Sequence, residues 1–93
     1  MTFEKLARIV ADDFKATMQE EGFSTFDDMR KCYWWEWSDV RDEVRAIIDE
    51  AAKDYGESFW MADDGTFIQI GACRDMSWRD FKKLLLAELE GKQ

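Results

Sequence analysis

The chain has no histidine and no proline among its 93 residues, and only two cysteines. Without histidine it lacks both the commonest general base and the commonest transition-metal ligand in proteins. No apolar run approaches the roughly 20 residues that a bilayer-spanning helix needs. The start of the chain, Thr2-Phe3-Glu4, is acidic and unlike a secretion signal. We therefore expect a soluble protein of the cytoplasm that does not contact a membrane.

Cys32 and Cys73 lie 41 positions apart, outside any C-x-x-C pair. This spacing is a poor match to zinc ligands. We expect two buried or half-buried thiols, with a disulfide between them as the alternative. Neither thiol has an imidazole to activate it, and turn chemistry explains the pair Asp63-Asp64. The sequence thus predicts no catalytic residue, no metal and no cofactor, and hence a protein that is not an enzyme.

Acidic residues outnumber basic ones by 21 to 13, which gives a net charge of −8. Direct binding of DNA or RNA requires a basic patch, and the densest basic pairs, Arg30-Lys31 and Lys82-Lys83, lie beside acids. We therefore expect no direct contact with nucleic acid. Hydrophobic residues make up 46% of the chain, too many for disorder. At this length we expect one domain over residues 1–93.

The first half of the chain has the apolar spacing of two helices. Thr2 is a suitable N-cap for the first helix, and Gly22 is a suitable stop. Ser24 or Thr25 caps the second, because the acids that follow favour a helix N-terminus. Its expected inward face comprises Phe26, Met29 and Tyr33. The run 32–37 has no clear period, which predicts the end of this helix and a connection.

The third helix has the most regular pattern in the sequence. Ser38 is expected to cap it, with Asp39 at the first helical position and Gly56 after the last. An uninterrupted apolar stripe follows the helix period: Val40, Val44, Ile47, Ile48, Ala51 and Tyr55. The stripe predicts one buried face and one solvated face.

The last part of the chain predicts a hairpin and a fourth helix. Two runs of period two, 58–62 and 66–70, flank Asp63-Asp64-Gly65, whose glycine suits a tight turn. Ser77 is expected to cap the final helix, and Gly91 to end it. The expected fold class is α+β, in the order α-α-α-β-β-α, with the helices packed with one β-hairpin.

Three tryptophans, Trp34, Trp35 and Trp37, fall within four residues. Positions i, i+1 and i+3 span too wide an arc of a helix to face inward together, so we expect at least one to be partly exposed. Exposed tryptophan is typical of binding hot spots. The alternative is that large rings fill the thin core of a small domain.

Acidic residues recur as adjacent pairs along the chain. On the third helix they lie mostly opposite the apolar stripe, at Asp39, Asp42, Glu43, Asp49 and Glu50. Such a face creates a negative potential that steers cationic partners, and its spacing could imitate a row of phosphates. The alternative is a solvated face that keeps the domain soluble.

These acidic pairs and the segment Tyr33-Trp34-Trp35-Glu36-Trp37, in a chain without a catalytic set, resemble the small inhibitors of phages and other mobile elements. The group is that of the anti-CRISPR proteins, within the wider class of DNA-mimic inhibitors. The resemblance implies a stoichiometric inhibitor that masks the nucleic-acid-binding surface of a CRISPR effector nuclease in a bacterial host. The expected partner-binding residues are Asp27, Asp28, Trp34, Trp35, Glu36, Trp37, Asp39, Asp42, Glu43, Asp49 and Glu50.

The competing hypothesis is a structural or assembly module. It would homo-oligomerise or dock through the tryptophan segment or through the hairpin edge, for which Phe67-Ile68-Gln69-Ile70 is the candidate strand. The expected state is accordingly a monomer or a homodimer.

Overall fold

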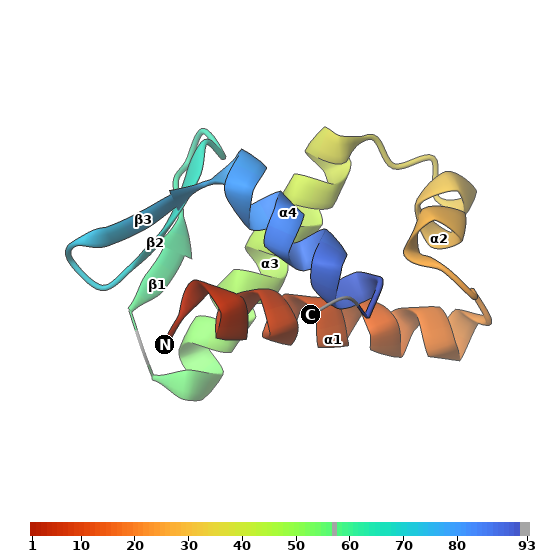
Figure 1. The fold of residues 1–93 in the computed structure, drawn as a ribbon, viewed down its shortest axis with the longest axis horizontal. Coiled ribbons are helices and arrows are strands. Elements are labelled where there is room, and N and C mark those ends of the chain that lie inside the picture. Colours follow the sequence, from red (N-terminus) through yellow and green to blue (C-terminus); the bar gives the residue numbers. More distant parts are fainter. Residues whose placement is uncertain (57, 92–93) are drawn as a thin grey trace.

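The computed structural model describes residues 1–56 and 58–91. Three helices are followed by three strands and a fourth helix (Figure 1). The elements are α1 (Phe3–Glu21), α2 (Phe26–Cys32), α3 (Trp37–Tyr55), β1 (Phe59–Met61), β2 (Phe67–Ile70), β3 (Arg74–Ser77) and α4 (Trp78–Leu89). The predicted α+β class is confirmed, and the observed order of elements, α-α-α-β-β-β-α, contains one strand more than the predicted order.

The strands form one antiparallel sheet in the order β1-β2-β3, so the predicted hairpin is present. The third strand is not evident in the sequence, because Arg74–Ser77 has no apolar alternation and is mostly exposed. It pairs with β2 through contacts such as Ile68 opposite Met76. Since β2 therefore has a neighbour on each side, the prediction of a free edge at residues 67–70 is wrong.

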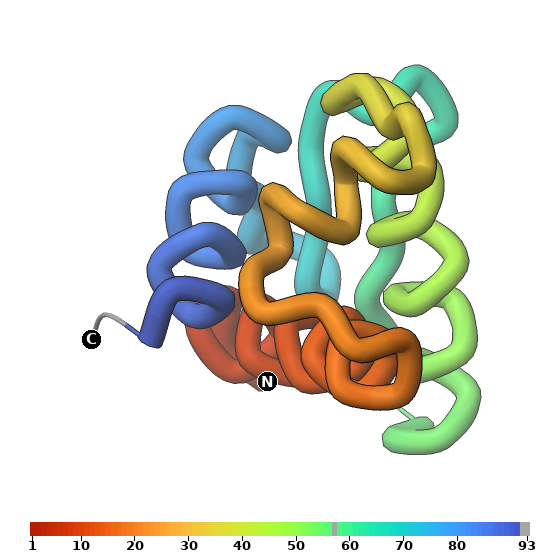
Figure 2. Tube along the Cα trace, turned by 90° about the vertical axis from the view of Figure 1, so that its right-hand side faces the viewer, coloured from red at the N-terminus to blue at the C-terminus, as the bar shows by residue number. Residues whose placement is uncertain are grey.

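One hydrophobic core lies between α1, α3, α4 and the sheet. Figure 2 shows α3 and α4 on opposite sides of this core, with α1 along the bottom. In β1 the buried Phe59 and Met61 alternate with the exposed Trp60, as a strand with one covered face requires. Burial of each large apolar side chain stabilises the fold by roughly 1.5–3 kcal/mol. The fully buried members of the core are Leu6, Ala7, Val10, Ala11, Met29, Val40, Val44, Ile48, Ile68, Phe81 and Leu85.

Helix α2 lies at one end of a molecule that extends 38 × 24 × 23 Å (Figure 1). Its seven residues bury two side chains in the core, Phe26 and Met29. Tyr33, expected on the same inward face, follows the last helical residue and is 42% exposed. This expectation is wrong because the ring of Tyr33 packs on the rings of Trp35 and Phe23 and does not enter the core.

Three predicted N-caps are confirmed. The side chains of Thr2, Thr25 and Ser77 each accept a hydrogen bond from the backbone N–H three positions on, at 3.0, 3.0 and 3.1 Å. Each bond satisfies a donor that the helix itself leaves unpaired. Helix α4 ends at Leu89, two positions before the predicted stop at Gly91.

The predicted start of α3 is wrong. The helix begins at Trp37, with Glu36 as its N-cap, and not after Ser38. The carboxylate of Asp39 accepts a hydrogen bond from the backbone N–H of Glu36 at 2.9 Å, which makes Asp39 the third helical residue and not the first. This reciprocal cap stabilises the earlier start.

Both cysteines are free and exposed, so the expectation of buried or half-buried thiols is wrong. Cys32 is the last residue of α2, and Cys73 lies in the β2–β3 turn, at the opposite end of the molecule (Figure 1). The buried positions of α2 are already taken by Phe26 and Met29, which leaves Cys32 in solvent.

Candidate partner-binding surface

The α2–α3 connection, residues 33–36, presents one tryptophan almost wholly to solvent. Trp34 is 88% exposed, and its backbone has a φ of 61°, in the left-handed region. This conformation costs a bulky residue roughly 1–2 kcal/mol. The backbone N–H of Trp34 donates to the carbonyl of Lys31 at 3.2 Å, and that of Trp35 donates to the carbonyl of Arg30 at 2.9 Å. The turn that holds Trp34 outward is thus hydrogen-bonded on both sides.

Arg30 fixes this connection from inside. Its guanidinium donates to the carbonyl of Trp35 and to the carboxylate of Asp27, both at 3.0 Å. The same guanidinium lies 5.0 Å from the ring centre of Trp37, in a cation–π contact. One side chain therefore ties α2, the connection and the start of α3 together, and the sequence contains no sign of this role.

Of the three neighbouring tryptophans, the structure exposes one. Trp35 is half-buried and stacks on the ring of Tyr33, with ring centres 5.1 Å apart. Trp37 is half-buried too, and the ammonium of Lys82 lies 3.8 Å from its ring centre. The prediction that at least one of the three is exposed is confirmed, in Trp34. Trp35 and Trp37 support the fold, which leaves Trp34 as the candidate anchor.

The outer face of α3 is acidic. All five of its predicted acids are exposed, and helical geometry places them within roughly 120° of the circumference, opposite the buried stripe. They are Asp39, Asp42, Glu43, Asp49 and Glu50. Asp54, four positions after Glu50, extends the same face, although sequence reasoning omitted it. One basic residue shares the face, Lys53, whose ammonium lies 3.6 Å from the carboxylate of Glu50.

The predicted acids of α2 and of the connection are exposed but not equivalent. Hydrogen bonds from Arg30 and then from Lys31 lower the pKa of Asp27, whose charge is therefore compensated within the fold. Asp28 lies in the first turn of α2, where a carboxylate interacts favourably with the helix dipole. Glu36 caps α3. The unpaired negative charge of the candidate surface thus lies mainly on α3.

The two arginines of α3 point away from its acidic face, toward the β1–β2 turn. Arg45 donates to the carbonyl of Asp63 at 3.1 Å. Arg41 packs over Gly65, so closely that a Cβ on this glycine would lie 2.6 Å from the Nε of Arg41. Both guanidinium groups are therefore held at the turn, away from the row of carboxylates.

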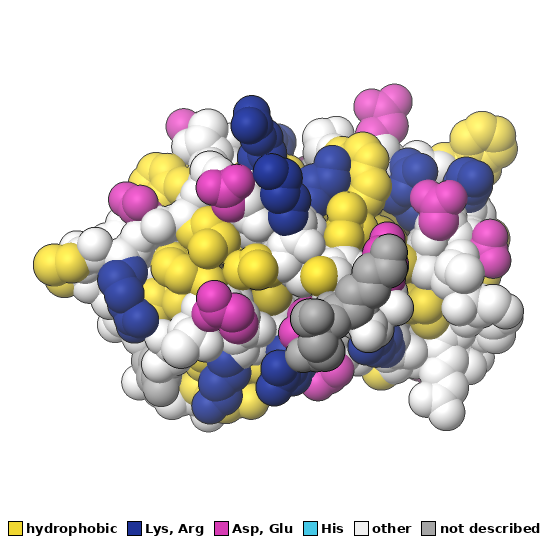
Figure 3. Space-filling view, in the orientation of Figure 1, with side chains coloured by type: hydrophobic (Ala, Val, Ile, Leu, Met, Phe, Trp, Pro, Cys, Tyr) yellow, Lys and Arg dark blue, Asp and Glu magenta, His cyan; other side chains and the backbone are white. Residues whose placement is uncertain are grey.

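Other parts of the surface carry mixed charge. The face shown in Figure 3, which α4 and the sheet occupy, has basic and acidic side chains side by side. Hydrophobic atoms project from it at the upper right, where Figure 1 has the α2–α3 connection. The charge of this face is therefore mixed, unlike that of the outer face of α3.

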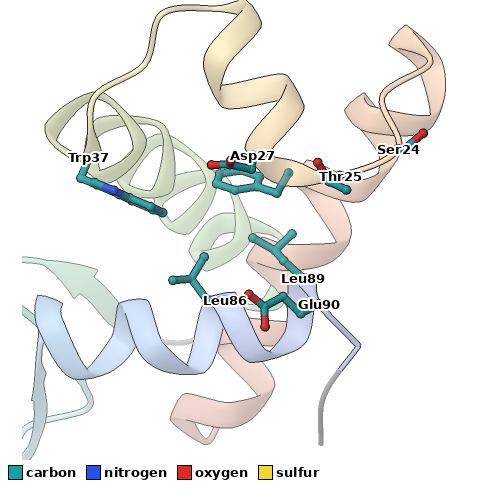
Figure 4. A pocket seen from close by; sticks show the side chains of 8 residues that line it. Ser24, Thr25, Asp27, Trp37, Leu86, Leu89 and Glu90 are labelled. Atoms are coloured by element: carbon teal, nitrogen blue, oxygen red, sulfur yellow. The ribbon is translucent and has the colours of Figure 1, made fainter.

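A groove of about 740 Å³ separates the start of α2 from the end of α4 (Figure 4). Its lining residues are Ser24, Thr25, Phe26, Asp27, Trp37, Leu86, Leu89 and Glu90. Carboxylates stand on both walls, at Asp27 and Glu90. Positive charges lie close by, because Arg30 and Lys31 pair with Asp27 and the ammonium of Lys82 lies over the ring of Trp37. Sequence reasoning misses this groove because its lining comes from three separate segments.

In the part of the chain that the structure describes, no group of three or more cysteine, aspartate or glutamate side chains is arranged to hold a metal ion. None of the described helices is long and apolar enough to cross a membrane. Comparison with protein-family models, curated proteins and solved structures found no match to this chain, so its function must be inferred from the surface itself.

Proposed function

We propose that the chain is a non-enzymatic protein-binding module that inhibits a nucleic-acid-binding protein by covering its cationic surface. The partner that fits the resemblance to anti-CRISPR proteins is a CRISPR effector nuclease of a bacterial host. Trp34 carries the proposal, because it is 88% exposed in a left-handed backbone conformation. Such a residue lowers stability and gains no packing, which is the behaviour expected of a binding anchor.

The outer face of α3 supports the same proposal through its charge. A row of carboxylates with a single lysine attracts a cationic groove over several ångströms and raises the rate of association. A desolvated indole then slows dissociation. The hydrogen-bonded connection holds the backbone of Trp34 in place before binding, so little backbone entropy is lost when the partner arrives.

The test is titration of the full chain against purified effector nucleases loaded with guide RNA, with inhibition of DNA cleavage as the second readout. We expect the affinity to fall steeply as salt rises, because exposed charges are screened. Trp34→Ala should weaken binding by about 30-fold or more, as for a hot-spot residue. Reversal of charge at Asp42, Glu43, Asp49 and Glu50 should weaken binding at low salt without unfolding the domain.

Two matched controls separate these effects from general damage. Trp60→Ala removes another exposed tryptophan, and Asp12→Lys with Asp13→Lys reverses an exposed acidic pair on α1. Both controls should bind as the unmodified chain does. An affinity that is the same at low and high salt would exclude the masking of a cationic groove by charge.

The competing function is assembly of copies of this chain through the exposed tryptophan. Sedimentation at rising protein concentration distinguishes the two. A mass that doubles with concentration, and that Trp34→Ala returns to the monomer, would support the assembly module and contradict the inhibitor. A monomer over the whole range would exclude assembly.

A further inference from the structure

Among the described residues, three exposed aromatic rings have no cation over them, Tyr33, Trp34 and Trp60, and the first two are adjacent in the chain. Among the described rings, Tyr55 and Trp37 each have a lysine or arginine within 6 Å of the ring centre. Within the same described residues, neither Tyr33 nor Trp34 has such a contact, although a lysine and an arginine precede them in α2. Both rings are therefore open to a cation from another molecule.

Tyr33 is a firmly supported platform. Its ring stacks on Trp35 at an interplanar angle of 26° and meets the ring of Phe23 edge-on, with centres 6.0 Å apart. It nevertheless remains 42% exposed, and the next residue is the protruding Trp34. The pair thus offers one fixed ring and one projecting ring at the same place in the fold.

Carboxylates stand next to this platform. Glu20 and Glu21 end α1, both are exposed, and neither forms an ion pair with another described residue. Partial desolvation raises the pKa of Tyr33, and the charge of Glu21 raises it further, with a smaller contribution from Glu20. Glu21 lies two residues before Phe23, whose ring meets that of Tyr33, so the end of α1 brings this negative charge beside the exposed ring.

We infer that the patch formed by Glu20, Glu21, Tyr33 and Trp34 receives an arginine side chain of the protein partner. The inference rests on the proposed function and specifies the chemistry of its anchor. A guanidinium is planar, always charged and weakly hydrated, so it stacks on an aromatic ring while it donates hydrogen bonds to a carboxylate. A lysine ammonium is attracted by the same charges but cannot stack in this way.

The discriminating measurement compares two labelled peptides of equal charge, nona-arginine and nona-lysine, titrated against the full chain by fluorescence anisotropy. The acidic face of α3 attracts both peptides, so the part of any difference that disappears when the two rings are removed is the part due to the patch. The patch should favour nona-arginine by about three- to fivefold, the scale of an exposed cation–π contact. Tyr33→Phe should keep this preference, since it keeps the ring.

Substitutions then locate the preference. Trp34→Leu and Tyr33→Leu, alone and together, should bring the two affinities to the same value. Glu20→Gln with Glu21→Gln should weaken nona-arginine binding about threefold more than Asp12→Asn with Asp13→Asn, a matched acidic pair on the same helix. Circular dichroism of each variant checks the fold, and Trp34→Leu remains informative if the Tyr33 variant unfolds, because Trp34 is almost wholly exposed.

Equal, salt-sensitive affinities for the two peptides would overturn the arginine site and leave the proposed function standing. A preference for arginine that survives in the double leucine variant would overturn it too, because the preference would then arise elsewhere. The effector titration decides the proposed function independently of both results.

Discussion

The β1–β2 turn and the α2–α3 connection are both short, polar or aromatic segments beside α3, yet they are built in opposite ways. In the turn, the Asp64 carboxylate accepts from the hydroxyl and the backbone N–H of Thr66 at 2.7 and 3.0 Å, and Arg45 donates to the carbonyl of Asp63. In the connection, the most prominent side chain, Trp34, is left in solvent.

The contrast separates residues that serve the fold from residues that serve a partner. Acids such as Asp63 and Asp64 look functional in the sequence, but the hydrogen bonds of the turn account for them. Trp34 has a backbone in the left-handed region that hydrogen bonds to the end of α2 support, but its side chain gains almost no packing in return. A residue that lowers stability in its own fold is the better candidate for binding.

The largest effect on stability is expected at the turn. Gly65→Ala places a Cβ 2.6 Å from the Nε of Arg41 at a φ of 74°, so we expect unfolding to become easier by about 2 kcal/mol. Gly71→Ala is the matched control, with a φ of 67° and nothing within 4 Å of the new Cβ, and should cost about 1 kcal/mol. Urea denaturation measures both. Equal losses would mean that the Arg41 side chain moves aside from the new Cβ at no cost in stability.

The second-largest loss of stability is expected at Arg30, which supports the α2–α3 connection. Arg30→Ala removes two hydrogen bonds and a cation–π contact from a largely buried guanidinium, for an expected loss of about 1–2 kcal/mol. Lys31→Ala is the control, because its 69% exposed side chain contacts the same Asp27 and should cost less than about 0.5 kcal/mol. Similar losses in the two variants would contradict the supporting role of Arg30.

A smaller effect of opposite sign is expected at Trp34. Trp34→Gly relieves the left-handed strain, which should stabilise the fold by about 0.5–1 kcal/mol, whereas Trp34→Ala keeps the strain and should be nearly neutral. Thermal unfolding of both variants checks this. Destabilisation by Trp34→Gly would show that the indole packs against the protein in solution. Trp34 would then serve the fold, as the residues of the β1–β2 turn do.

The smallest effect is the pH dependence of the turn. The hydroxyl of Thr66, followed by its backbone N–H, lowers the pKa of Asp64 below 3.8, so its contribution is present above that value and is lost as the pH falls through the lower, folded-state pKa. Asp64→Asn should therefore destabilise at pH 7 and lose this difference between about pH 5 and pH 2. Asp63→Asn is the control, because Arg45 donates to the backbone carbonyl of residue 63, which this substitution leaves in place. If the difference in stability between Asp64→Asn and the unmodified chain stays constant over this range, the charge of Asp64 does not stabilise the turn.

Much of the fold could be predicted because it depends on local signals. The caps at Thr2, Thr25 and Ser77 and the Asp-Asp-Gly turn follow from residues within four positions of one another. Strand β3 could not be predicted in this way, because Arg74–Ser77 has a weak pattern of its own and pairs through the neighbouring β2. The start of α3 was misplaced because Ser38, a preferred N-cap residue, lies two positions after the actual cap, Glu36, whose backbone N–H is bound by Asp39.

The sequence by itself determined the α+β class, the helices, the hairpin and the acidic outer face of α3, because each depends on periodicity along the chain. Only the tertiary structure decided which tryptophan is exposed. That choice depends on how Arg30 ties Trp35 and Trp37 into the fold, and on the turn that directs Trp34 outward. It also brought Phe23, which follows the end of α1, against the ring of Tyr33, because contacts between separate helices have no counterpart in local spacing.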